Sequence, residues 1–369
     1  MSWGRPETTP ERLLTTLLSP AAALYGVGSY LRLRAYGSGH MKRHKVSVPV
    51  VSIGNLTCGG TGKTPVTIDL AQRLVAAGYT VAILSRGYQR KSTEELLVVS
   101  DGQGRIASCT DAGDEPYMMA HAVPAARVIV SAKRFIAAEV AIGIYDANII
   151  LLDDGFQHLS LQRDHDIVLI DYNDDPVSDS LLPAGRLREP ISALTRATWV
   201  VITRVPARPN AAKLSYLEEL VSDRAERAQI TRCSFVPHSL RPLGLATTAD
   251  SLSSLAGTKV IACSGIARPR FFVDQLNELK AQVVKQRSFG DHHWWQAADI
   301  ETLRQDLLDT GAELIVTTTK DASRMDSAMF RQLPIAALEL TTQWLGAVPV
   351  LSAPPFSISN NTPQRDEMR

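Results

Sequence analysis

The sequence predicts an α/β protein with a doubly wound, mostly parallel sheet, a second and smaller α/β domain toward the C-terminal end, and a membrane-associated helix at the N-terminal end. Short runs dense in Val and Ile recur along the chain, and most lack alternating polar residues, as strands buried on both faces do. Helical patterns lie between several of these runs. This alternation is typical of βαβ units, which build parallel sheets with helices on both faces.

Two series of candidate strands follow one another along the chain. The first series comprises residues 47–54, 80–85, 127–130, 148–153, 166–171 and 199–203. The second comprises residues 230–236, 259–265, 282–289, 313–319 and 336–340. The clearest helical patterns cover residues 63–77, 210–228, 269–280 and 297–310. Gly78 is a typical helix stop after the first of them.

Length and composition fit a folded chain of about two domains. The chain has 369 residues, 45% of them hydrophobic and 21% charged, and a domain takes roughly 150 residues. Together with the two strand series, this predicts domains at 46–228 and 229–350. Residues 1–45 would form an anchoring helix and a basic segment. The tail at 351–369 is rich in Pro, Ser and Asn, and we expect it to be disordered.

Charge and cysteine content exclude several classes of protein. Thirty-nine Lys and Arg against 38 Asp and Glu leave a net charge of +1, so we expect no nucleic-acid partner, and no obligate protein partner is evident either. The four cysteines are far apart and form no CxxC pair. This spacing argues against a zinc ribbon or a disulfide framework and suits a reducing compartment.

An uncharged apolar stretch, residues 13–31, lies near the N-terminus and precedes a basic cluster that begins with Arg32 and Arg34. A spanning helix needs about 20 strongly apolar residues, and this stretch is diluted by Thr, Ser, Pro and Gly. The residues alone leave open a helix packed on the fold, a shallow membrane anchor, a full span and a cleaved signal peptide.

A glycine-rich segment, IGNLTCGGTGKTP at residues 53–65, predicts a nucleotide phosphate site. It follows a strand and begins a helix, so glycine N–H groups and the helix N-terminus would face phosphate oxygens. Lys63 would neutralise the β- and γ-phosphates, and the Thr64 hydroxyl would bind Mg²⁺. The expected nucleotide contacts are Thr57, Cys58, Gly59, Gly60, Thr61, Gly62, Lys63 and Thr64.

Two further features refine this prediction to a P-loop NTPase-like fold with room for kinase activity. Thr57 replaces the first glycine of GxxxxGK[ST]. Cys58 occupies the position of the signature lysine that dimerising ATPases carry before GGxGK[ST], which argues against a switch ATPase. Asp153 and Asp154 follow an apolar strand directly, which is where P-loop proteins hold Mg²⁺. A turn with solvated aspartates is the alternative.

The set of motifs resembles one family, the tetraacyldisaccharide 4'-kinases of lipid A biosynthesis in Gram-negative bacteria. The segments that carry the resemblance are 53–65, SRGY at 85–88, GDEP at 113–116, DDGFQH at 153–158, LPAGRLREP at 182–190, 263–269, 289–293 and TTKD at 318–321. They follow the family's order and extend to about residue 325. The Thr57 substitution is itself usual in this family.

The resemblance implies an activity and a location. The enzyme would transfer the γ-phosphate of ATP, with Mg²⁺, to the 4'-hydroxyl of a tetraacylated glucosamine disaccharide 1-phosphate, which makes lipid IVA. It would act at the cytoplasmic face of the bacterial inner membrane through an N-terminal anchor. With this resemblance, the anchor becomes the favoured interpretation of residues 13–31.

The resemblance also implies catalytic roles. Asp114 would accept the proton of the attacking hydroxyl, and His292 would orient or tune it, because an unperturbed aspartate is a weak base. Thr64, Asp153 and Glu189 would bind Mg²⁺, and Lys63 would follow the charge into the transition state. Without the resemblance, Asp114 is equally a helix N-cap and His292 a surface turn residue.

Substrate contacts are the least specific part of the prediction. The candidates are Arg86, Asp154, His158, Arg186 and Asp291, with Arg134 and Arg188 as further arginines that suit phosphate oxygens. Phe289, Trp294 and Trp295 would lie near acyl chains or pack in the core. Two rival functions remain: a P-loop kinase with a soluble acceptor, and a membrane-tethered NTPase that transfers no phosphate.

Overall fold

The computed structural model describes residues 9–349 except 105–106, 246–250 and 326, and one sheet of twelve strands runs through them. The strands are β1 Val50–Asn55, β2 Val81–Ser85, β3 Leu96–Asp101, β4 Arg127–Ser131, β5 Ile149–Asp153, β6 His165–Asp171, β7 Trp199–Thr203, β8 Gln229–Pro242, β9 Lys259–Ser264, β10 Gln282–Ser288, β11 Leu314–Thr318 and β12 Ile335–Trp344. Their order across the sheet is β10-β9-β11-β12-β8-β7-β6-β1-β5-β2-β4-β3.

Two strand pairs, β8 with β12 and β3 with β4, are antiparallel, and the other neighbours are parallel. The predicted mostly parallel sheet is therefore confirmed. All eleven predicted strands are present, with ends that differ by a few residues. β3 was not predicted, although residues 96–99 form a short apolar run. It lies at the edge of the sheet and follows β2 with no helix between them, so it interrupts the βαβ rhythm on which the prediction relied.

The helices cover both faces of the sheet. They are α1 Thr9–Gly37, α2 Lys63–Ala76, α3 Cys109–Ala112, α4 Asp114–Ala122, α5 Arg134–Gly143, α6 Ala211–Arg224, α7 Pro269–Glu278, α8 Ala297–Thr310, α9 Thr319–Ala322 and α10 Ser327–Phe330, with the 3₁₀ helices η1 Ile191–Arg196 and η2 Leu252–Leu255. Those over 63–77, 210–228, 269–280 and 297–310 match the predicted patterns.

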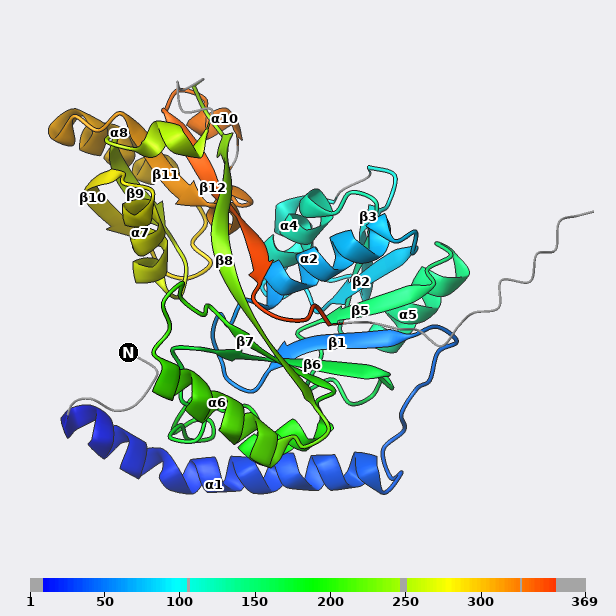
Figure 1. Ribbon diagram of the computed structural model, residues 1–369. Helices are drawn as coiled ribbons and strands as arrows, with labels where there is room; N and C mark the ends of the chain where they lie inside the picture. The colour runs from blue at the N-terminus through cyan, green and yellow to red at the C-terminus, as the bar shows by residue number, and fades with distance from the viewer. Residues whose placement is uncertain (1–8, 105–106, 246–250, 326, 350–369) are drawn as a thin grey trace, which may run out of the picture.

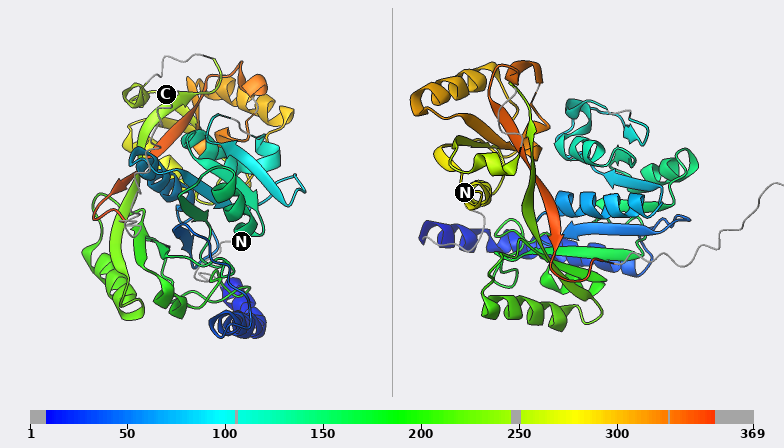
Figure 2. Two further views of the ribbon diagram at one scale, coloured as in Figure 1. Left: turned by 90° about the vertical axis from the view of Figure 1, so that its right-hand side faces the viewer. Right: turned by 45° about the horizontal axis from the view of Figure 1, so that its top comes forward.

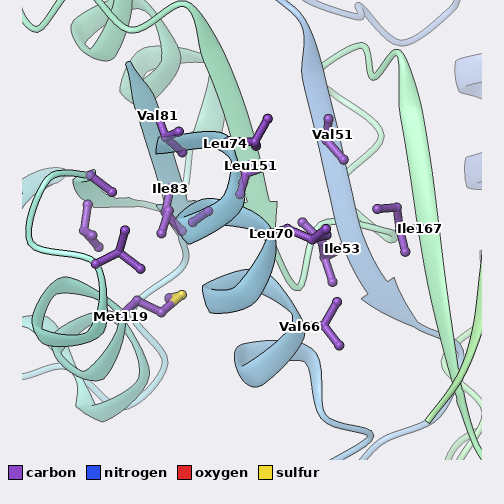
Figure 3. Close-up of a cluster of buried hydrophobic side chains, with 14 of the residues drawn as sticks. Val51, Ile53, Val66, Leu70, Leu74, Val81, Ile83, Met119, Leu151 and Ile167 are labelled. Atoms are coloured by element: carbon purple, nitrogen blue, oxygen red, sulfur yellow. The ribbon is translucent and has the colours of Figure 1, made fainter. Parts of the chain in front are cut away.

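Alternate residues of each central strand face opposite helical layers. Ile53 and Leu151 pack on Leu70 of α2 in one buried cluster (Figure 3). Leu152, the chain neighbour of Leu151, packs with Ala138 of α5 in a second cluster on the other face. Because a strand buried on both faces needs apolar residues throughout, this packing explains the near-continuous apolar runs of the sequence.

Strand β8 joins the two halves of the sheet, which we call the P-loop half (β1–β7) and the C-terminal half (β9–β12). β8 pairs in parallel with β7 at its start and antiparallel with β12 along most of its length. The two long strands run side by side from one half to the other (Figures 1 and 2). The predicted boundary at residue 229 is the first residue of β8. The predicted tail, 351–369, lies outside the described residues.

Helix α1 lies outside the sheet, along one side of the P-loop half (Figures 1 and 2). It contains the predicted apolar stretch, with Pro20 inside the helix. Its exposed aliphatic side chains include Leu13, Leu14, Leu17, Leu24, Val27 and Leu31. Among the residues that the structure describes, no helix combines the length and the apolarity that crossing a membrane requires.

Candidate functional site

The glycine-rich loop connects β1 to α2, as the sequence predicts. Its last residue, Gly62, is the N-cap of α2 and has a φ of 92°, a left-handed conformation that favours glycine. A Cβ atom on Gly62 would lie 2.3 Å from the ring of Phe235, which comes from β8. Glycine is therefore required here for two reasons, and the loop packs directly on the strand that joins the two halves.

Three side chains hold carbonyl groups of this loop. Arg204 donates to the Gly60 carbonyl at 2.6 Å, Thr203 to the Thr61 carbonyl at 2.8 Å, and Asn55 to the Thr57 carbonyl at 2.8 Å. With its carbonyls turned toward these donors, the loop leaves N–H groups available for an anion. The N–H of Cys58 is an exception, because it already donates to the Arg186 carbonyl at 2.7 Å.

Lys63 and Asp154 form an ordered charge cluster at the loop. The Lys63 ammonium lies 3.2 Å from Oδ1 of Asn55 and 3.5 Å from Oδ1 of Asp154. Arg188 Nη1 contacts both oxygens of Asp154, at 2.9 and 2.8 Å. Burial raises the pKa of Asp154, but the charges of Lys63 and Arg188 outweigh this effect and lower that pKa to about 2. Asp154 is therefore a fixed negative charge that holds Lys63 in place.

Asp153 ends β5, directly beside β1, and its environment suits a cation. Its Oδ2 accepts a hydrogen bond from Ser85 at 3.3 Å, whereas its buried Oδ1 has no hydrogen-bond partner. Burial, followed by the nearby charges of Glu115 and Asp154, raises the pKa of Asp153 to about 7. An unsatisfied carboxylate oxygen among other carboxylates is what Mg²⁺ would relieve, so the residues present fit this ion.

The other two predicted Mg²⁺ ligands differ in their surroundings. Thr64 is buried in the first turn of α2, next to the loop. Glu189 is buried and forms an ion pair with Arg196 at 2.5 Å. Within the described part of the chain, no three His, Cys, Asp or Glu side chains gather closely enough to hold a metal ion by themselves. An ion here would need the Thr64 hydroxyl or the phosphate oxygens of a nucleotide.

Asp114 begins α4 and is buried beside residues of the C-terminal half. Its Oδ2 lies 2.8 Å from Nδ1 of His292 and 2.9 Å from Nη1 of Arg324. Burial raises the pKa of Asp114, but the hydrogen bond with His292 and the positive charges of Lys320 and Arg324 bring that pKa below its ordinary value. The structure thus brings together the two residues that the sequence analysis paired.

Lys320 lies on the other side of the His292 ring. Its ammonium lies 3.2 Å from Nε2 of His292, 3.2 Å from Asp291 and 3.8 Å from Glu115. The ring is thus held between Lys320 at Nε2 and Asp114 at Nδ1.

A small hollow opens at this pair. It is lined by Tyr88, Gln89, Asp114, His292, Trp294 and Arg324. Its walls come from the segment after β2, from α4 and from the C-terminal half. Ser85, which donates to Asp153, and Tyr88, which lines the hollow, are three positions apart at the end of β2. The segment SRGY therefore connects the end of β5 to the hollow.

The sequence analysis missed Arg324 and the role of Lys320. Lys320 lies in the TTKD motif but was given no role. Arg324 contacts Asp114 and also Asp321, at 2.5 Å. It lies just after α9 in a segment with no motif of its own, so only the fold reveals that it faces Asp114.

The predicted substrate residues are in diverse environments. Arg86 is exposed, and Arg134 is buried with its Nε unpartnered. Burial, and then the charge of Arg134, lowers the pKa of His158 to about 3, so this histidine is neutral. Arg186 is paired with Asp174 at 3.0 Å and with Asp179 at 2.7 Å, and thus has a structural partner set already.

The three aromatic candidates near His292 separate into two environments. Trp294 lines the hollow. Trp295 is buried and contacts the rings of Phe289 and Phe330 with centroids 4.9 and 5.7 Å apart. Of the two interpretations that the sequence leaves open, the core therefore applies to Trp295.

Comparison with known proteins gives a consistent result. The LpxK family, described as tetraacyldisaccharide-1-P 4'-kinase, matches residues 14–351. A tetraacyldisaccharide 4'-kinase of Geobacter sulfurreducens is 36% identical over 342 residues, 93% of each chain. One of Anaeromyxobacter sp. strain K is 38% identical over 309 residues, 84% of this chain and 81% of that protein. A crystal structure of LpxK from Aquifex aeolicus in complex with ATP superimposes with a TM-score of 0.71 at 30% identity, covering 90% of this chain and 95% of that one.

The matched region includes both the phosphate loop and the Asp114–His292 pair, and the relatives are matched over most of their own length. The fold is also that of the Aquifex aeolicus structure. The chain therefore belongs to the tetraacyldisaccharide-1-P 4'-kinase family.

Proposed function

We propose that this chain transfers the γ-phosphate of ATP to the 4'-hydroxyl of a tetraacylated glucosamine disaccharide 1-phosphate, the product being lipid IVA. The observation that carries the proposal is the contact of Asp114 with His292 at the hollow, which the SRGY segment connects to Asp153 through Ser85 and Tyr88. Membership of the family and the ATP complex of the Aquifex aeolicus relative support it.

The chemical step requires a proton acceptor and charge neutralisation. The oxygen of the 4'-hydroxyl attacks the γ-phosphorus, the bond from that phosphorus to the bridging oxygen of ADP breaks, and Asp114 takes the hydroxyl proton. His292 and Arg324 orient the carboxylate, because both contact its Oδ2. Lys63 neutralises the phosphate charge that shifts toward the leaving ADP.

Mg²⁺ is the metal that this site fits. When bound, it would neutralise the β- and γ-phosphate oxygens. Thr64 and Asp153 would hold it. Glu189 is a further candidate ligand, and its carboxylate is paired with Arg196 in this structure. The unpartnered Oδ1 of Asp153 is the feature that supports this assignment.

The residues proposed to contact the lipid acceptor are chosen by their charge. Arg86, Asp154, His158, Arg186 and Asp291 are the candidate contacts. Arg86 is the exposed cation among them, and Asp291 contacts Lys320, which also contacts His292. Arginine suits the anomeric phosphate of the lipid, since its guanidinium donates two parallel hydrogen bonds.

We also propose that the chain works at the cytoplasmic face of the inner membrane, with α1 lying in the interface. The exposed apolar side chains of α1 and the basic residues that follow suit an apolar surface bordered by anionic headgroups. In this arrangement residues 46–228 supply the phosphate loop and Asp114, while residues 229–350 supply His292, and the two domains complete one site.

A direct assay tests the activity. The purified full-length chain, radiolabelled ATP and Mg²⁺ are mixed with tetraacyl disaccharide 1-phosphate in detergent, and label should appear in the lipid. Glucosamine disaccharide without acyl chains serves as the soluble acceptor. Labelling of the soluble acceptor alone would favour the soluble-acceptor kinase. ATP binding with no labelled product would contradict the kinase proposal altogether.

A matched pair of variants tests the anchor. In Leu17→Ser/Leu24→Ser, two exposed leucines of α1 become polar, and we expect weaker co-sedimentation with vesicles of phosphatidylethanolamine and phosphatidylglycerol. Leu308→Ser on α8 is the control, because Leu308 is 74% exposed, the same fraction as Leu17 and Leu24. Equal loss of vesicle binding in both variants, or no loss in either, would argue against an anchor at α1.

A further inference from the structure

Two hydrogen bonds connect α1 to segments that surround the phosphate loop. Tyr25 donates from its hydroxyl to the Arg188 carbonyl at 2.8 Å, and Arg32 donates to the Gln157 carbonyl at 3.0 Å. These partners lie 163 and 125 positions away in the sequence. A helix that only tethered the chain to lipid would have no reason to make polar contacts with the backbone of these segments.

We propose that Tyr25 and Arg32 are positioning residues for the phosphate loop, so that α1 helps set the geometry in which ATP is bound. The inference deepens the proposed function and rests on one part of it, that the loop at Lys63 binds ATP. It assigns α1 a part in nucleotide binding that is separate from attachment to lipid.

The route from Tyr25 passes through Arg188. The Arg188 N–H donates to the Leu56 carbonyl at 2.7 Å, at the start of the phosphate loop. The Arg188 side chain holds both oxygens of Asp154, and Oδ1 of Asp154 is 3.5 Å from the Lys63 ammonium. Tyr25 therefore hydrogen-bonds to the backbone of Arg188, and the side chain of the same Arg188 pairs with Asp154.

The same segment is also paired with the loop along its length. Thr57 and Leu187 form an antiparallel bridge, and the Cys58 N–H donates to the Arg186 carbonyl at 2.7 Å. A shift of the segment would therefore move the loop backbone as well as the Arg188 side chain. Tyr25 connects α1 to this segment through its hydrogen bond with the Arg188 carbonyl.

The route from Arg32 passes through Gln157. The Gln157 side chain donates to the Asn55 carbonyl at 3.0 Å, at the end of β1. Asn55 in turn donates to the Thr57 carbonyl and accepts from the Lys63 ammonium at 3.2 Å. Both routes therefore end at Lys63, the residue expected to contact the β- and γ-phosphates.

The helix is also packed closely against this region. A Cβ atom on Gly26 would lie 2.9 Å from Cδ1 of Leu181, a residue of the segment that leads to Arg188. Glycine next to Tyr25 thus permits the close approach that its hydrogen bond needs. Since coupling between two sites is reciprocal, a change in how α1 is seated and a change in ATP affinity must accompany each other.

The test is Tyr25→Phe, which removes one hydroxyl and keeps the ring. We expect the Kd for ATP of the full-length protein in detergent, measured by calorimetry, to rise roughly 3- to 10-fold, the usual effect of losing one hydrogen bond. Tyr30→Phe is the control, since Tyr30 lies on the same helix with its ring 57% exposed. Arg32→Gln and the exposed Arg34→Gln form a second matched pair.

Two further measurements distinguish a specific effect on ATP binding from a general loss of structure. Vesicle binding and thermal stability of Tyr25→Phe should equal those of Tyr30→Phe. In a double-mutant cycle for ATP binding, Tyr25→Phe and Asp154→Asn should be non-additive, because the route from Tyr25 runs through Asp154, whereas Tyr30→Phe and Asp154→Asn should be additive. This pattern would support the inference.

Two results overturn the inference: an ATP Kd for Tyr25→Phe equal to that of Tyr30→Phe, or full additivity with Asp154→Asn. These outcomes differ from a failure of the proposed function. If the unsubstituted protein binds ATP but labels no lipid, the proposed activity fails while the effect of Tyr25 on ATP binding is still measurable.

Discussion

His292 Nδ1 lies 2.8 Å from Oδ2 of Asp114, although 178 positions separate the two residues in the sequence. Asp114 begins α4 in the P-loop half, and His292 follows β10, the outermost strand of the C-terminal half. The pair therefore exists only when both halves are folded against each other. It also lines the hollow, together with Tyr88 of the segment that follows β2.

Replacing Asp114 with Asn should remove the proton acceptor and keep the shape of the site. We expect the rate of phosphoryl transfer to fall by about 10²–10⁴-fold, the usual contribution of a general base, while the Kd for ATP changes little. Transfer is measured with labelled ATP and lipid acceptor, and ATP binding by calorimetry. A variant that retains most of its transfer rate would show that Asp114 is not the base.

Lys320→Met should shift the pH dependence of the reaction. The Lys320 charge is one of the causes that lower the pKa of Asp114, so removing it raises that pKa. The active form is the carboxylate, so the acid limb of the kcat/KM profile should move to higher pH. Lys259→Met, at the exposed lysine that begins β9, is the control and should leave the profile unchanged. An unchanged acid limb in Lys320→Met would contradict the assigned roles.

Asp153→Asn should stabilise the metal-free protein at neutral and higher pH. The folded-state pKa of Asp153 is raised to about 7, against an ordinary value of about 3.9. Between these values the folded state holds more protons than the unfolded state, so stability falls as pH rises from about 4 to about 7. The variant should have the higher Tm at pH 8, by about 2–4 °C for each kcal/mol that the substitution adds to the free energy of unfolding. This difference in Tm should shrink toward pH 4.

The control for this prediction is Asp223→Asn, at an exposed aspartate of α6, which should show no pH-dependent gain. Adding Mg²⁺ at pH 8 should raise the Tm of the unsubstituted protein more than that of Asp153→Asn. Equal Mg²⁺ effects on the two proteins would place the ion elsewhere.

Gly62→Ala should destabilise the protein and weaken ATP binding. A left-handed φ costs a residue with a Cβ about 1–2 kcal/mol, and the added Cβ would lie 2.3 Å from the Phe235 ring. We expect a lower Tm by scanning calorimetry and at least a tenfold rise in the Kd for ATP. Gly60→Ala is the control for stability, because the nearest atom to its Cβ would be Nη2 of Arg204 at 4.0 Å. Similar Tm values for the two variants would show that the loop tolerates a shift at Phe235.

Much of the fold could be predicted from local patterns. The central strands of the P-loop half are apolar runs because helices cover both of their faces, and Lys63 follows a glycine whose φ is 92°. β3 escaped prediction although it begins with four apolar residues, because it follows β2 with no helix between them and pairs antiparallel with β4. The alternation of strands and helices predicts the parallel strands, and it does not predict an antiparallel strand at the edge.

The site was predicted in two unequal parts. The phosphate loop and the Asp153 end of β5 follow from residues close together in the sequence. The Asp114–His292 contact depends on how strands far apart in sequence are ordered in the sheet, so only the family resemblance pointed to it. Neither a local motif nor the family resemblance indicated Arg324. It lies just after α9, and its contact with Asp114 joins residues far apart in the sequence.

The continuity of the sheet through β8 has a practical consequence for anyone who wishes to study half of this molecule. A polypeptide truncated at residue 228 would lack β8, whose first residue, Gln229, pairs with Trp199 of β7. One edge of β7 would then have unpaired backbone amide and carbonyl groups. Such edges recruit strands from other chains. The truncated protein should therefore aggregate. Structural work on the P-loop half requires a polypeptide that includes β8, because β8 covers the exposed edge of β7.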